Sequence, residues 1–273
     1  MFLAGLMMTA LVVASGIAWA AAISCPNRDG NLCVGTDRQD TMTGRDSRAD
    51  DMRGKGGADE MRGRGGADEM QGGTGGDTIL GQDGPDTLSG GPGADTLGGG
   101  KGEDHLAGGE GPDALNGGSG DDTYNFGIND WGNDTITDTP DGDNDPLTGN
   151  FAQFGFPNPL TTGLTVNLTS SANAPEVRNG TLTGTVNWSN NAIDGVYVGS
   201  GSTDPTVTIR STINGNAAAN QLIAKGGVDT INAGAGNDWI SVQDFAGGDT
   251  VDCGGQAGDK VFYDQGDTVK NCP

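Results

Sequence analysis

Large aliphatic side chains are scarce in this sequence of 273 residues. Leu, Ile, Val and Phe together make up about 17% of the chain, whereas glycine alone supplies 52 residues. Few aliphatic residues and a formal charge of −23 are typical of disordered chains, because too little apolar surface offsets the entropy of ordering. A conventional globular core is therefore excluded. Either the chain is disordered, or something other than a core stabilises its fold.

Histidine and glutamate are almost absent as well. The single histidine, His105, excludes an H-E-x-x-H zinc protease, and no serine lies in a G-x-S-x-G motif. Lys55 and Lys101 each follow a glycine but precede another, which excludes a phosphate-binding loop. The chain has 32 Asp but 5 Glu, and short carboxylates on a glycine-rich backbone favour turns and cation sites. The negative charge argues against a nucleic acid partner.

The first 22 residues carry no charged side chain and contain one apolar stretch, Ala10 to Ala22. Ala18 and Ala20 provide the small residues of a cleavage site, so we expect a secretory signal peptide over residues 1–22. A membrane anchor is the alternative, and a lipoprotein attached through Cys25 is a weaker one. No other stretch is long and apolar enough to span a bilayer, so no membrane span is expected after cleavage.

Four cysteines form two close pairs, Cys25 with Cys33 and Cys253 with Cys272. An even count in an exported chain predicts two disulfides, each closing a small loop near one end. Neither pair has the C-x-x-C spacing of a zinc site. Such terminal cross-links suit a repeat fold, whose end repeats lack a neighbour on one side.

A nine-residue repeat dominates the sequence between residues 45 and 125. An apolar residue recurs nine apart without a gap from Met52 to Tyr124, and an aspartate stands two residues before each one, from Asp50 to Asp122. Glycines lie four and seven residues before most of these apolar positions, as in Gly117-Gly118-Ser119-Gly120-Asp121-Asp122-Thr123-Tyr124-Asn125. The unit is G-G-x-G-x-D-x-U-x, where U is apolar.

Each slot of this unit has a physical role. One apolar residue between two polar ones predicts a three-residue strand whose centre faces inward. The glycines permit positive φ angles and close backbone approach, so six residues can reverse direction and present carbonyl oxygens. Aspartate adds a carboxylate to those carbonyls, and such an oxygen-rich set suits a hard cation that takes six to eight oxygen ligands.

This repeat resembles that of the RTX or haemolysin-type calcium-binding proteins. The resemblance implies an all-β fold, a right-handed parallel β-roll in which two nonapeptides make one coil and Ca²⁺ ions lie in the turns between coils. Residues eighteen apart then become neighbours along the roll. Asp59, Asp77, Asp95 and Asp113 are expected along one edge, and Asp50, Asp68, Asp86, Asp104 and Asp122 along the other.

Stacking these aspartates without metal is costly. Carboxylates in coils about 4.8 Å apart repel by about 1 kcal/mol in water and about 3.5 kcal/mol at an effective dielectric of about 20. One apolar residue per nonapeptide is too little to overcome this. We therefore predict a chain that folds with Ca²⁺ and is unfolded without it.

The repeats depart from the unit at their N-terminal end. The Asp50 repeat has Arg45 at its first position and Arg48 at a glycine position, and basic residues Lys55 and Arg64 replace glycine in the next two. Basic and acidic residues balance up to residue 64, so the whole net charge lies after it. We expect these basic side chains to be solvated and to offset nearby aspartates; attachment to an anionic polymer or lipid is the alternative. The first repeats are expected to bind Ca²⁺ weakly or not at all.

After Tyr124 the period loosens. Asp134 again stands two residues before Ile136, whereas the D-x-D-x-D run at Asp141 fails as an EF-hand because Pro146 and Ala152 occupy its glycine and glutamate positions. Alternating runs such as Leu164–Leu168 and Val207–Ile209 predict strands, either as longer coils of the same solenoid or as a small separate β-domain.

The repeat resumes near the C-terminus. Asn220, Asp229 and Asp238 each precede an apolar residue by two, and the pattern then drifts through Asp249, Asp259 and Asp267. Asn220 lacks the charge and is expected to be structural. The candidate metal ligands of the whole chain are Asp59, Asp68, Asp77, Asp86, Asp95, Asp104, Asp113, Asp122, Asp229 and Asp238.

These observations predict five segments and one leading function. The segments are a signal peptide (1–22), a cap with a Cys25–Cys33 disulfide (23–46), the roll (47–126), irregular β rungs (127–213) and a C-terminal repeat block with a Cys253–Cys272 disulfide (214–273). The leading function is Ca²⁺ binding by a secreted, extracellular, non-enzymatic protein, of bacterial origin, in which several Ca²⁺ ions drive folding.

Two other functions are compatible with the sequence. One is a Ca²⁺-dependent adhesin or matrix component that binds a cell-surface or matrix polymer. The other is an enzyme acting on acidic polysaccharide, for which the few suitable residues are Arg178, Arg210, Trp188 and Tyr197. His105, beside Leu106, is expected to be exposed rather than catalytic.

Overall fold

The fold was derived from a computed structural model. It describes residues 21–25, 32–127, 133–137, 151–156, 164–167, 176–179, 182–188, 195–200, 211–244 and 247–273. The expected signal peptide lies almost wholly outside these residues. The described residues form strands and turns and contain no helix, hence no helix long and apolar enough to cross a membrane.

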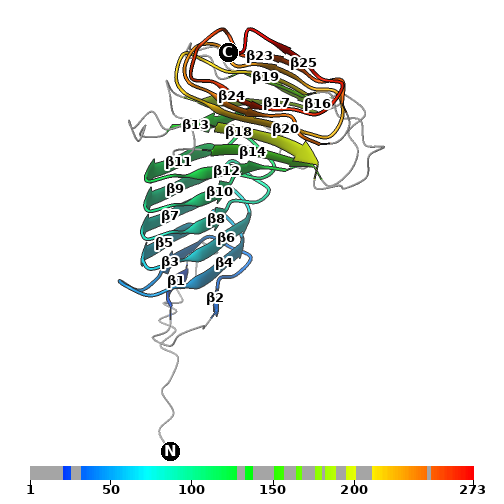
Figure 1. The fold of residues 1–273 in the computed structure, drawn as a ribbon. Coiled ribbons are helices and arrows are strands. Elements are labelled where there is room, and N and C mark those ends of the chain that lie inside the picture. The colour runs from blue at the N-terminus through cyan, green and yellow to red at the C-terminus, as the bar shows by residue number, and fades with distance from the viewer. Residues whose placement is uncertain are drawn as a thin grey trace, which may run out of the picture.

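The strands stack into a solenoid with two strands per coil (Figure 1). One sheet holds, in spatial order, β1 (Ala21–Ser24), β3 (Asp40–Thr43), β5 (Glu60–Gly65), β7 (Thr78–Asp83), β9 (Thr96–Lys101), β11 (Ala114–Ser119), β13 (Asn133–Ile136), β17 (Leu182–Trp188) and β16 (Glu176–Asn179). The opposite sheet holds β2 (Leu32–Val34), β4 (Asp51–Gly56), β6 (Glu69–Thr74), β8 (Thr87–Ser89), β10 (His105–Ala107), β12 (Thr123–Phe126), β14 (Phe151–Phe156), β18 (Gly195–Ser200), β20 (Gln221–Lys225), β22 (Trp239–Ser241) and β24 (Lys260–Phe262). The third holds β15 (Leu164–Asn167), β19 (Ser211–Asn214), β21 (Thr230–Asn232), β23 (Thr250–Asp252) and β25 (Thr268–Lys270).

Pairing within the roll is parallel and follows the predicted eighteen-residue period. Met52 lies beside Met70, and Ile79 beside Leu97, in ladders that run the length of the roll. The alternation of apolar and polar residues explains this register, because a shift by one residue would turn every apolar side chain to solvent. The sequence prediction of a parallel β-roll is confirmed.

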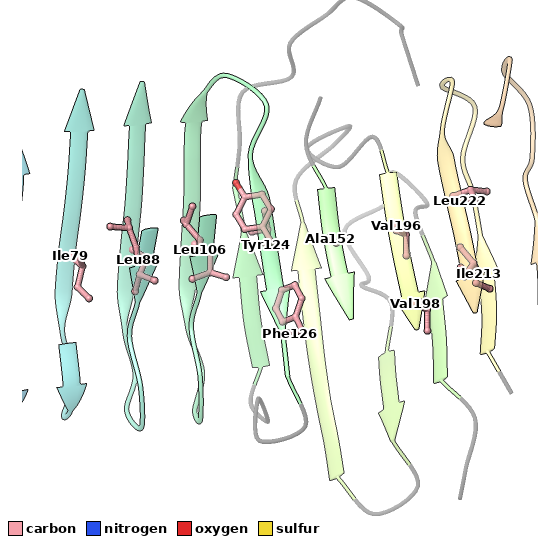
Figure 2. Close-up of a cluster of buried hydrophobic side chains, with 14 of the residues drawn as sticks. Ile79, Leu88, Leu106, Tyr124, Phe126, Ala152, Val196, Val198, Ile213 and Leu222 are labelled. Carbon is pink, nitrogen blue, oxygen red and sulfur yellow. The ribbon is translucent and has the colours of Figure 1, made fainter. Parts of the chain in front are cut away.

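The core of the roll is a ladder of single apolar side chains between the two sheets. Its rungs are Met42, Met52, Met61, Met70, Ile79, Leu88, Leu97, Leu106, Leu115 and Tyr124, each almost fully buried. Figure 2 shows how this line of side chains continues from Ile79 through Tyr124 and Phe126 to Val196 and Leu222. His105 is exposed on the outer face beside Leu106, as the sequence predicts.

The middle segment continues the same solenoid. Strand β14 pairs in parallel with β12 on one side and β18 on the other, and β13 pairs with β17. The pair β16–β17 is antiparallel and is an exception to the expected all-parallel arrangement. Of the two strands predicted here, the one at Leu164–Leu168 corresponds to β15, whereas Val207–Ile209 lies outside the described residues.

Both predicted disulfides are present. Cys25 is bonded to Cys33 near the first coil, and Cys253 to Cys272 at the last. Cys33 and Cys253 are also rungs of the buried ladder, so each disulfide joins a terminal segment to the core. No cysteine is left free.

The structure corrects the predicted register of the Asp50 repeat. Its first-position residue is Gly44 rather than Arg45, because Gly44 N–H donates to Arg62 O just as Gly35 N–H donates to Arg53 O one half-coil earlier. The turn from Gly44 to Asp50 is thus one residue longer than the unit. The repeat also begins earlier than predicted, since Asp40 and Met42 take the aspartate and apolar positions.

Candidate metal centre

The aspartates of the repeat form two columns along the edges of the roll. The first aspartate column is Asp40, Asp59, Asp77, Asp95, Asp113 and Asp134, and the second is Asp50, Asp68, Asp86, Asp104 and Asp122. In each column the backbone N–H of one aspartate donates to Oδ1 of the aspartate in the next coil, at 2.7–2.8 Å. One carboxylate oxygen therefore holds the coils in register.

The second carboxylate oxygen has a different environment. Oδ2 of Asp59, Asp68, Asp77, Asp86, Asp95 and Asp113 is buried and receives no hydrogen bond from the described residues. A buried oxygen without a donor costs free energy, more so when it carries charge. Six such atoms at the same position of the nine-residue repeat indicate that a ligand outside the polypeptide satisfies them.

Glycine at the first position makes room for this oxygen. A Cβ atom added at Gly54 would overlap Oδ2 of Asp59, and the same holds for Gly72 with Asp77 and Gly90 with Asp95. The need for glycine here is therefore steric, in addition to its freedom of φ. Each carboxylate lies against bare backbone within its own turn.

Backbone carbonyls of the turns also point along the column. A Cβ at the fourth-position Gly93 would overlap the carbonyl oxygen of Gly75 in the preceding coil, and one at Gly111 would overlap that of Gly93. Outside the strand ladders, no backbone N–H of residues 50–127 donates to the fourth-position carbonyls of Gly57, Gly66, Gly75 or Gly84. These carbonyls and the Asp Oδ2 atoms are the unsatisfied acceptors of the turns.

Burial makes these carboxylates unusually weak acids. Desolvation raises the pKa of Asp86 and Asp113 to about 7, and that of Asp59, Asp68 and Asp95 to about 6. The N–H donated to Oδ1 lowers each pKa, while neighbouring carboxylates in the column raise most of them further. Without a cation, the charged form is thus disfavoured in the folded roll.

The chemistry of this donor set fits a hard divalent cation. Carboxylate and carbonyl oxygens are the ligands of Ca²⁺, whereas the nitrogen and sulfur ligands preferred by Zn²⁺ are absent from the described turns. The described residues contain no group of three or more His, Cys, Asp or Glu side chains that could hold a metal. A cation in these turns would therefore depend on carbonyl oxygens for part of its coordination.

The C-terminal block repeats the arrangement with wider spacing. Asp229 N–H donates to Asp249 Oδ1, twenty residues on, and Asp238 N–H donates to Asp259 Oδ1, twenty-one residues on. Oδ2 of Asp229 and Asp238, both predicted ligands, is buried without a donor, and burial raises their pKa to about 7. Oδ2 of Asp249 and Asp259 is also buried without a donor among the described residues; the sequence placed both in the drifting pattern but not among the candidate ligands.

Other predicted features have plain structural roles or lie outside the described residues. Asn220 Oδ1 accepts the N–H of Asn216 and closes its own turn. Arg53 pairs with Asp51 and Arg64 with Asp46 at the surface, as expected of solvated basic side chains, whereas Arg45 is buried against Asp50, contrary to that expectation. Asp141, Asp143, Asp145 and Arg210 are not described, nor are the side chains of Arg178 and Trp188.

Comparison with known families agrees with this geometry. The RTX calcium-binding nonapeptide repeat matches the chain in four copies, at residues 45–79, 71–106, 98–136 and 212–242. These copies cover the roll and the start of the C-terminal block, including every predicted ligand. No curated protein matches the chain.

Proposed function

We propose that this chain, an RTX calcium-binding repeat protein, is a secreted, non-enzymatic protein whose roll folds when several Ca²⁺ ions bind. The observation that carries this proposal is the series of buried, donor-free Asp Oδ2 atoms at a constant period. A cation between coils satisfies these oxygens and removes the repulsion along each column. Calcium-binding free energy then becomes folding free energy.

The residues proposed to hold Ca²⁺ are the ten aspartates named from the sequence, assisted by carbonyls of the glycine turns. Each aspartate contributes Oδ2 to the ion and keeps Oδ1 for the N–H of the preceding coil. Charge neutralisation by the ion lets neighbouring carboxylates remain ionised at neutral pH. The polypeptide thus supplies the register and the anionic oxygens, and calcium supplies the positive charge.

Two disulfides and the expected signal peptide support an extracellular location, because disulfides persist in oxidising compartments. External Ca²⁺ at millimolar concentration would keep the sites filled, whereas low cytosolic Ca²⁺ would leave the chain unfolded before export. The non-enzymatic assignment rests on the repeat itself, which accounts for the buried aspartates without a catalytic role.

Far-UV circular dichroism of the oxidised chain, with Ca²⁺ and with excess chelator, tests the proposal. We expect a β-sheet spectrum with Ca²⁺ and a largely disordered spectrum after chelation, restored when Ca²⁺ is added back. A spectrum that does not change on chelation would contradict the proposal.

A further inference from the structure

The turn that begins the second aspartate column differs from the inner turns. Asp50 is the first aspartate of the second column among the described residues, and its own N–H donates to Asp68 Oδ1. Arg45 contacts this aspartate: its Nε lies 2.7 Å from Asp50 Oδ1, and its backbone N–H donates to Asp50 Oδ2 at 2.7 Å. Both oxygens of this buried carboxylate therefore have donors from within the turn.

The guanidinium also satisfies a carbonyl of the same turn. Arg45 Nη2 donates to Ala49 O at 2.6 Å. The side chains of Arg45 and Asp50 are 9% and 1% exposed, so the pair is largely shielded from water. The guanidinium thus brings a positive charge to the column carboxylate and to one carbonyl of its turn. It contacts Oδ1 and the carbonyl next to Asp50, while Oδ2, the oxygen without a donor in the inner turns, accepts the Arg45 N–H.

The backbone at Arg45 also differs from that of the inner turns. In the inner turns the second-position residue has positive φ, as in Lys55 and Arg64 at 82°, and Gly73 N–H donates to Gly90 O of the next coil. Arg45, which follows the first-position Gly44, has no positive φ, and its N–H turns inward to Asp50. The second position thus donates to the carboxylate of its own turn, as Thr36 does to Asp40 in a turn without the extra residue.

The first turns of the other columns use related closures. Thr36 donates both its N–H and its hydroxyl to Asp40 Oδ2, although Oδ1 of Asp40 stays without a donor. In the C-terminal block the corresponding residue is the neutral Asn220, whose Oδ1 accepts the N–H of Asn216. The chain therefore begins a column with its own donors or with an uncharged residue, most completely at Asp50.

We propose that the Arg45 guanidinium is a tethered cation that replaces Ca²⁺ at Asp50, so that the Ca²⁺ sites of the second column begin at Asp68. This inference rests on the proposed function for the meaning of the inner turns. The Arg45–Asp50 ion pair satisfies the first carboxylate of the second column without a bound ion. Asp50 accordingly belongs to the ion pair and contributes no ligand.

Calcium stoichiometry of the full oxidised chain, measured by calorimetry, tests this assignment. Asp50→Asn is expected to bind as many Ca²⁺ ions as the wild type, because Asp50 holds none. The matched control Asp95→Asn, an inner-turn aspartate, is expected to lose at least one ion. Loss of an ion from Asp50→Asn as well would overturn the inference.

Thermal unfolding in saturating Ca²⁺ gives a second readout. Arg45→Gln leaves a buried carboxylate unpaired and is expected to lower Tm by on the order of 10 °C, whereas Arg53→Gln, which removes an exposed pair, changes it little. Equal effects of the two substitutions would overturn the inference. If Asp50→Asn fails to fold, the Tm values of Arg45→Gln and Arg53→Gln test the inference instead.

The two proposals fail in different ways. A wild-type chain that binds no Ca²⁺ would defeat the proposed function, while the Arg45→Gln and Arg53→Gln comparison would still report on the ion pair.

Discussion

In the coils from Met52 to Leu115, a strand buries one large apolar side chain and then, two residues later, a glycine. In the coils from Val196 to Val251, the same inward slot carries a side chain in every strand except that of Ile213, where it is Gly215. The other occupants are Val198, Ala224, Ala233, Val242 and Cys253. The nonapeptide roll therefore buries one side chain of any size per strand, and most strands of the C-terminal block bury two.

The glycine slot explains the difference. Gly54 and Gly72 leave the space that Oδ2 of Asp59 and Asp77 occupies, so the roll exchanges apolar volume for a buried carboxylate. Each large apolar side chain contributes about 1.5–3 kcal/mol on full burial, which the roll forgoes in every strand. The C-terminal block keeps buried aspartates at 229, 238 and 249 but supports them with a thicker core. The roll should depend on Ca²⁺ more strongly than the block.

Chelation is expected to produce the largest difference between the two regions. Amides of the roll between Met52 and Tyr124 should lose most of their hydrogen-exchange protection in chelator, because their buried carboxylates then repel without compensation. Amides between Ser211 and Val242 should keep more of theirs. Peptide-resolved hydrogen exchange measures both, and equal loss in the two regions would break the comparison.

Removing the last disulfide should narrow the difference in stability between the C-terminal block and the roll. The Cys253–Cys272 bond links residues nineteen apart in the sequence, and its loss through paired alanine substitutions should destabilise the C-terminal block by roughly 3 kcal/mol. Denaturant titration in Ca²⁺, followed by the fluorescence of Trp239 in a chain whose other tryptophans are replaced by phenylalanine, gives the free energy of unfolding. If the block unfolds at the same denaturant concentration in the variant as in the wild type, the disulfide does not stabilise it.

Filling a glycine position should harm the roll selectively. Gly111 has a φ of 129°, and a Cβ there would overlap the carbonyl oxygen of Gly93, so Gly111→Ala should cost at least about 1–3 kcal/mol. A Cβ added at Gly127 would meet no atom within 4 Å, and Gly127→Ala serves as the control with a change within about 0.5 kcal/mol. Comparable Tm values for the two variants would contradict the steric account.

Acidification should stabilise the folded state of both the roll and the C-terminal block when calcium is absent. Burial raises the pKa of Asp86 in the roll and Asp238 in the block to about 7, from 3.8 for the ordinary group. The folded state then binds more protons than the unfolded state between about pH 4 and about pH 7, so the free energy of unfolding falls as pH rises through that window. Metal-free chain should therefore gain β-structure at about pH 5 relative to about pH 8. Circular dichroism in calcium-free buffer checks this, and a signal that weakens on acidification would contradict it.

Much of this organisation could be predicted from the sequence, because the roll is local in origin. The nine-residue phase from Asp50 to Asp122 placed the apolar ladder, the two columns and the register of eighteen residues without any long-range information. The extended turn before Asp50 was missed because Arg45 stands at the expected spacing, and only the hydrogen bond of Gly44 reveals the true first position.

The third sheet, which runs from β15 to β25, could not be predicted from the sequence. Strands β15 and β19 pair across more than forty residues, and β15 lies outside the matched copies of the nonapeptide repeat. The role of Arg45 was also hidden, since a basic residue in an acidic chain usually lies solvated at the surface. Its burial comes from the contacts with Asp50 and Ala49 inside the folded turn, which the sequence does not display.

Calcium titration of the oxidised full chain by calorimetry, with circular dichroism recorded at each step, tests the central claim most directly. The account predicts that several Ca²⁺ ions bind per chain and that β-structure appears in step with their binding. Binding of no Ca²⁺, or binding of Ca²⁺ to a chain whose β-structure is already complete, would contradict it.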